Sequence, residues 1–158
     1  MQKGIATLEI VMVIFIVGVL ASCAVPNAVR VLDRVALDYE TKRLYTELRF
    51  LQSHERMTYM IDSHFNKPEN FQSKLTVYPE RYVITKNGDD NIVYDEHEFF
   101  NGVTTSNILA IKFDDMGKPQ SSSDTALNGH IIIKSRLGKI LRIRFDSVGR
   151  FRGARPDE

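Results

Sequence analysis

The apolar positions of the chain begin with one long run near the N-terminus. From Ile10 to Val25 nearly every side chain is apolar and none is charged. Together with residues 5–9 the run comprises about 21 residues, and a helix of that length, rising about 1.5 Å per residue, spans the roughly 30 Å hydrocarbon core of a bilayer. The pattern predicts a membrane-spanning helix over residues 5–27.

A helical pattern continues beyond this run. From Ala28 to Met60 there is no Gly or Pro, and apolar residues recur at steps of three, four or seven. This apolar stripe consists of Val29, Leu32, Ala36, Leu37, Leu44, Leu48 and Leu51. Charged residues stand between them, namely Arg34, Asp38, Glu40, Lys42, Arg43, Glu47, Arg49 and Glu55. The pattern predicts an amphipathic continuation over residues 28–62, with the stripe packed on a domain, the charged face solvated and Pro26 bending the helix.

After Asp62 the pattern changes to a period of two, which is typical of strands. The strand candidates are Lys74–Tyr78, Arg81–Thr85, Ile92–Tyr94, Glu98–Phe100, Ile108–Phe113, His130–Lys134, Ile140–Phe145 and Arg150–Arg152. Turn signals such as Asn87-Gly88 separate several of them. Because no helical stretch lies between the candidates, we expect antiparallel pairing.

Residues 63–158 are therefore predicted to form one β-rich globular domain, arranged as a β-sandwich or as two small sheets capped by the helix. The fold class is α+β, with a long N-terminal helix packed on antiparallel sheet. The sequence indicates no internal repeat and no second domain.

Glu9 is the one charged residue at the edge of the apolar run, and only Met1–Gly4 precede the predicted helix. A carboxylate costs about 2.5–3.5 kcal/mol near the centre of a bilayer, so a lone membrane acid indicates a function. If the chain is cut after Gly4, the new amino group of Ile5 lies one helical turn from Glu9. The amine and the carboxylate can then neutralise each other, within one subunit or between neighbours.

The segment from Gly4 to Glu9, with the apolar run behind it, resembles the class III leader of type IV pilins and type II secretion pseudopilins. The resemblance implies that residues 1–4 are a leader peptide, which a prepilin peptidase removes after Gly4 before it methylates Ile5. It also implies that Glu9 receives the N-terminus of a neighbouring subunit and that Pro26 kinks the helix. Ile5 departs from the family's usual Phe, whereas the Thr-Leu-Glu ending at Glu9 is kept.

The C-terminal part resembles the closing strands of GspH/FimT-type minor pilins. The matching strings are Phe113–Pro119, Gly129–Ile133 and Ile143–Arg152, and the last contains the Gly-Arg-x-Arg element of that branch at Gly149–Arg152. The resemblance implies a subunit of a pilus, secretion or competence assembly. We expect it to span the inner membrane once, with a cytoplasmic N-terminus and an exported domain. Its expected partners are the prepilin peptidase, other pilins and the inner-membrane assembly platform.

The charge of the chain is divided unevenly. The 158 residues carry a net charge of +1, but residues 134–158 hold eight basic and three acidic residues, a net of +5. The remainder therefore carries −4. In a strand, Arg150 and Arg152 would stand on one face with Phe151 in the core, which makes them, together with Arg155, candidate phosphate ligands. FimT-like pilins use this element to capture DNA, so DNA is an alternative partner; a solvated strand face is the structural alternative.

A second interpretation concerns Cys23. Leu20–Cys23 is similar to a lipobox, in which Cys23 would be acylated and become the mature N-terminus. Helical patterning that continues past Cys23 favours the membrane span. Since Cys23 is the only cysteine, the chain has no intrachain disulfide.

Motifs for catalysis or metal binding are weak in this sequence. The four histidines, His54, His64, His97 and His130, are scattered, with no ligand pair at the spacing of a zinc site. The acidic string Asn87–Asn91 lacks the alternating ligands of an EF-hand loop and predicts a plain turn. We expect no catalytic residue, no metal and no cofactor, and we do not expect an enzyme.

Overall fold

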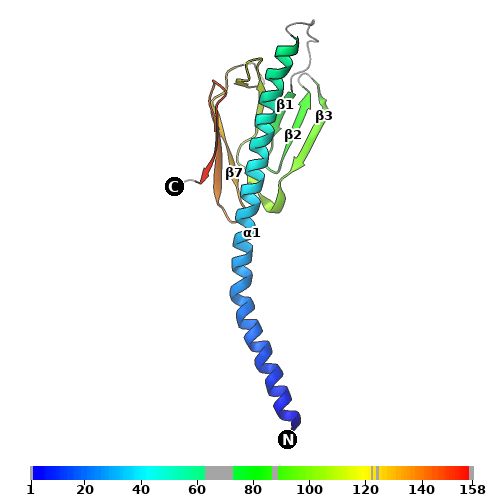
Figure 1. Ribbon diagram of the computed structural model, residues 1–158, viewed down its shortest axis with the longest axis vertical. Helices are drawn as coiled ribbons and strands as arrows, with labels where there is room; N and C mark the ends of the chain where they lie inside the picture. The colour runs from blue at the N-terminus through cyan, green and yellow to red at the C-terminus, as the bar shows by residue number, and fades with distance from the viewer. Residues whose placement is uncertain (1, 63–72, 87–88, 122, 124, 157–158) are drawn as a thin grey trace.

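The computed structural model describes residues 2–62, 73–86, 89–121, 123 and 125–156. One helix, α1 (Gln2–Asp62), runs along the molecule, and its N-terminal half projects from the domain as a stalk (Figure 1). Pro26 lies inside the helix without ending it. The two predicted helical segments therefore form one continuous element, with no linker between them.

The stalk is apolar and uncovered. Every residue from Glu9 to Leu32 is exposed, and Phe15 retains 70% of its accessible surface. The most apolar 18-residue window of α1 has a mean hydropathy of 2.4, and none of that window is buried. Apolar surface left in water is less stable than buried apolar surface by roughly 25 cal/mol per Å², so the stalk is more stable in an apolar environment. By length and composition, α1 can cross a membrane once.

The C-terminal half of α1 belongs to the core of the domain. Five residues of the predicted stripe are buried, namely Ala36, Leu37, Leu44, Leu48 and Leu51. Val29 and Leu32 are not: they are 46% and 50% exposed, because the helix meets the domain only from Asp33 onward. The predicted packing of the stripe on the domain is therefore confirmed from Ala36 onward. It is wrong for Val29 and Leu32, which lie before the helix meets the domain.

The strands form two antiparallel sheets. The first has the order β3-β2-β1-β5-β6, with β1 (Ser73–Val77), β2 (Arg81–Lys86), β3 (Asp89–Glu98), β5 (Leu109–Phe113) and β6 (Pro119–Gln120). The second has the order β4-β7-β8-β9, with β4 (Thr104–Thr105), β7 (Gly129–Lys134), β8 (Ile140–Phe145) and β9 (Phe151–Pro156). Helix α1 lies across both sheets (Figure 1), and one cluster of buried residues joins all three. The predicted α+β class with antiparallel pairing is confirmed.

Three strand predictions need correction. Ile92–Tyr94 and the first residue of Glu98–Phe100 belong to the single strand β3, after which a short 3-10 helix, η1 (Phe100–Gly102), turns the chain. Asn101 adopts a left-handed conformation there, with φ 57°, which ends the extended backbone. Strand β9 begins at Phe151 and not at Arg150. The two-residue strands β4 and β6 were not predicted, because so short a segment shows no period. The Asn87-Gly88 turn lies outside the described residues.

Two charged residues of the predicted solvated face are buried instead. Glu40 is fully buried, and its carboxylate accepts hydrogen bonds from His97 Nε2 at 2.8 Å and from the Phe100 N–H at 3.0 Å. Glu55 is 5% exposed and accepts from the Ser73 N–H at 2.9 Å. Buried carboxylates need such partners. These two tie α1 to η1, to the end of β3 and to β1.

Candidate functional site

The first candidate site is the N-terminal end of α1. Gly4, Ile5 and Glu9 all lie within this helix. Glu9 lies four positions after Ile5, which corresponds to about 6 Å along the axis and roughly one turn. Glu9 is exposed, and it is the only charged residue between Gly4 and Arg30. The helix thus places the carboxylate one turn from the expected cleavage point; its role in assembly stays a prediction.

The second feature of the stalk is the segment around Pro26. Proline lacks an N–H group, so the carbonyl of Ser22 loses its helical donor, which is the physical basis of the predicted bend. The side-chain amide of Asn27 donates to the Cys23 carbonyl at 3.1 Å. Cys23 itself is exposed within the continuous helix.

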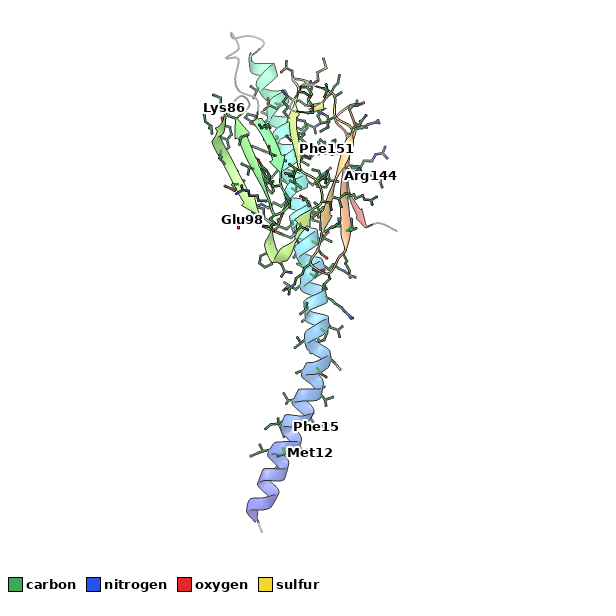
Figure 2. All side chains as sticks on the ribbon, turned by 180° about the vertical axis from the view of Figure 1, so that it is seen from behind. Met12, Phe15, Lys86, Glu98, Arg144 and Phe151 are labelled. Carbon is green, nitrogen blue, oxygen red and sulfur yellow. The ribbon has the colours of Figure 1, made fainter. Side chains whose placement is uncertain are left out.

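The third candidate site is the outer face of the second sheet. The register of β7, β8 and β9 places Arg144 directly opposite both His130 and Arg152. All three side chains are exposed, and Arg144 points away from the domain (Figure 2). The backbone register also pairs Arg142 with Arg155, whose side chain lies outside the described residues, so the basic row consists of His130, Arg144 and Arg152. Like charges directly opposite each other destabilise a sheet, so this basic row favours an anionic ligand.

Arg150 does not lie in the last strand beside Arg152, as the sequence predicted. It lies in the turn before β9, and its Nε donates to Asp146 Oδ2 at 2.8 Å. The backbone N–H of Arg150, and then its guanidinium, hold the pKa of the Asp146 carboxyl below its usual value. Phe151 is buried, as predicted, and Arg152 is exposed. The structure therefore brings together Arg144 and Arg152, whereas Arg150 is paired with Asp146.

The turn that carries Arg150 has a counterpart in the first sheet. Residues 113–118 and 145–150 share the pattern Phe-Asp-x-x-Gly followed by a basic residue. Asp114 Oδ1 accepts from the N–H groups two and four residues later, at 3.0 and 2.7 Å. Asp146 Oδ1 does the same at 3.1 and 2.9 Å. The two turns therefore share a sequence pattern and a hydrogen-bond pattern, and the Phe-Asp-x-x-Gly motif could have indicated this similarity from the sequence alone.

One side chain of α1 binds both turns. Gln52 is 3% exposed, and its Nε2 donates to the carbonyl oxygens of Gly117 and Gly149, each at 2.7 Å. Both glycines have positive φ, 72° and 85°. A Cβ at Gly149 would lie 2.5 Å from the Gly117 oxygen. The glycine of the Gly-Arg-x-Arg element is therefore required by packing.

Among the described residues, no group of three or more histidine, cysteine, aspartate or glutamate side chains is arranged to hold a metal ion. Comparisons of the chain with models of known protein families, with curated proteins and with solved structures find no match.

Proposed function

We propose that this protein is a membrane-anchored assembly subunit of the GspH/FimT minor pilin or pseudopilin type. The observation that carries the proposal is the two-part helix α1. Its first half is apolar and exposed, and its second half forms part of a core with two antiparallel sheets. Such a helix anchors the subunit before assembly and offers a long apolar surface to neighbouring helices within it.

The charges at the start of α1 support the same proposal. Cleavage after Gly4 would leave a positive amine on Ile5, one turn from the negative Glu9. In lipid each charge stabilises the other, and the neighbouring subunit's groups can serve equally well. We propose that Glu9 binds the N-terminus of an adjacent subunit. The prepilin peptidase and the inner-membrane assembly platform would then be its other partners, with the N-terminus in the cytoplasm and the domain outside.

Processing gives the direct test of the proposal. The intact mass of the mature protein, expressed with its native assembly system, is expected to correspond to loss of residues 1–4 and gain of one methyl group on Ile5. Loss of residues 1–22 with acylation of Cys23 would instead establish the lipoprotein alternative. An uncleaved N-terminus in cells that process another prepilin would contradict the proposal. A Gly4→Leu variant, which alters the cleavage point but not the apolar run, is the matched control.

A second candidate function, DNA capture, is favoured by the basic row on β8 and β9. Changing Arg144 and Arg152 to Ala is expected to weaken binding to a short DNA duplex and to reduce the slope of log K against log salt by about 1.5–2, since each phosphate contact contributes about 0.9. Fluorescence anisotropy of labelled DNA across a salt series measures both quantities. Changing Arg150 alone is expected to have a smaller effect, because its guanidinium pairs with Asp146.

The control for this experiment removes the same charge elsewhere. Lys42 and Lys86 lie away from the basic row, on α1 and β2, and their joint change to Ala also removes two positive charges. This control is expected to keep the wild-type slope. If both double variants lower it equally, binding follows net charge and the row is not a DNA site. If neither changes it, DNA capture through this face is excluded.

A further inference from the structure

We propose that a groove at the base of the domain binds the headgroup of an anionic phospholipid. The groove has a volume of about 580 Å³ and lies between α1 and the turn that joins β7 and β8. The stalk part of α1 emerges from one end of the domain (Figure 1). The lining of the groove comes from two elements, residues Asn27, Arg30, Val31, Arg34 and Val35 of α1 and residues Leu137 and Lys139 of the β7–β8 turn. The proposal rests on the membrane anchor of the proposed function.

The lining combines positive charge with apolar surface. Arg30, Arg34 and Lys139 are exposed, and no ion pair joins any of them to another described residue. Arg30 and Arg34 stand four residues apart on one helix face, where like charges repel. An anion between them would relieve that repulsion, and guanidinium groups bind phosphate through paired N–H donors.

The apolar part of the groove matches the rest of a lipid. Val31 is 62% exposed, Val35 57% and Leu137 52%. These side chains extend the apolar surface of the stalk past the first arginine, beside the three cations. A free phosphate ion would leave them in water, whereas a phospholipid offers both a phosphate and a glycerol–acyl region. The amphipathic lining therefore selects the lipid over a soluble anion.

The β7–β8 turn is fixed over the helix by Asp33. This carboxylate is 2% exposed, and its Oδ1 accepts from the Leu137 N–H at 3.2 Å. Its Oδ2 is buried without a hydrogen-bond partner among the described residues. Asp33 thus positions Leu137, which lines the groove, with Lys139 two residues further along the turn. Asp33 contributes one negative charge, whereas Arg30, Arg34 and Lys139 of the groove carry three positive charges.

The position along α1 agrees with the headgroup layer. Counted from Val25 at the end of the apolar run, Arg30 lies about 7.5 Å and Arg34 about 13.5 Å further along the axis. The polar layer of each leaflet is roughly 5–8 Å thick. Arg30 therefore falls within this layer, and the longer side chains of Arg34 and Lys139 can reach back to it from above.

The test uses the full-length protein in neutral detergent, followed by thermal unfolding with circular dichroism. Short-chain phosphatidylglycerol is expected to raise the unfolding midpoint by about 4 °C, whereas the matching phosphatidylcholine and soluble glycerol phosphate leave it unchanged. The triple variant Arg30→Gln, Arg34→Gln, Lys139→Gln is expected to lose this shift. A matched triple variant, Lys42→Gln, Arg144→Gln, Arg152→Gln, is expected to keep it.

The outcomes are separable. Equal shifts with both lipids, a retained shift in the groove variant, or equal loss in both triple variants would overturn the proposal. A shift with glycerol phosphate alone would assign the groove to a soluble anion and would also overturn it. The midpoint of the groove variant without lipid is expected to match the wild type, because all three replaced side chains are exposed. Failure of the anchor itself would be seen separately, as wild-type protein that does not float with phosphatidylcholine vesicles.

Discussion

Replacing Glu9 by Gln is expected to leave the protein in the membrane but to remove it from the assembled filament. Insertion should not suffer, because Gln is uncharged and costs less than a carboxylate in lipid. In the proposed assembly the Ile5 amine would lose its partner, and breaking one side of a buried ion pair costs about 3–5 kcal/mol. That cost corresponds to a fall of more than about 100-fold in the assembly equilibrium, measured as the ratio of filament-bound to membrane-bound subunit.

The control for Glu9 is a change of similar size in the same stalk that alters no charge. Phe15→Leu keeps the apolar surface and is expected to assemble at the wild-type level. Methylation and cleavage of both variants, read from intact mass, must be complete before the ratio is compared. A Glu9→Gln subunit found in the filament at the wild-type ratio would show that the carboxylate has no role in assembly.

Replacing Gly149 by Ala is expected to destabilise the domain by about 3 kcal/mol. The φ of 85° disfavours a residue with a Cβ by about 1–2 kcal/mol. The new Cβ would also lie 2.5 Å from the Gly117 oxygen and 2.9 Å from Gln52 Nε2, and such overpacking costs about 1–3 kcal/mol. Urea unfolding of the full-length protein in detergent, followed by circular dichroism, measures the free energy difference.

Gly138 supplies a matched control for this prediction. Its φ is also 85°, but no atom lies within 4 Å of the position where a Cβ would stand. Gly138→Ala therefore carries the backbone cost alone and is expected to lose about 1–2 kcal/mol. If the two variants lose equal stability, the contact between Gln52 and the two turns contributes little. Because Gly149→Ala is expected to destabilise the domain, a DNA-binding test should alter the arginines and leave Gly149 in place.

The helix and most strands could be predicted because local sequence determines them. A long uncharged run and a helical spacing without Gly or Pro are sufficient to indicate α1, and period-two runs such as Ile140–Phe145 match β8 residue for residue. The burial of Glu40 could not be predicted in this way. It depends on His97 and Phe100, 57 and 60 residues away in the chain, and periodicity within a helix carries no information about them.

The candidate basic site was predictable only in part, for a similar reason. Alternation along β9 correctly placed Phe151 inside and Arg152 outside. The environment of Arg150 depends on Asp146, which belongs to the preceding turn. Arg144 and Arg152 lie opposite each other because of the register between β8 and β9. The alternation of side chains within one strand does not determine that register.

The uninterrupted α1 has a mechanical consequence. Because α1 continues from the stalk into the domain with no linker, the position of the stalk is coupled to that of the domain. A translation of the stalk along its axis by one helical turn, about 5.4 Å, would therefore move the domain by the same distance. Rotation of the stalk about its own axis would likewise turn the basic row of His130, Arg144 and Arg152 through the same angle.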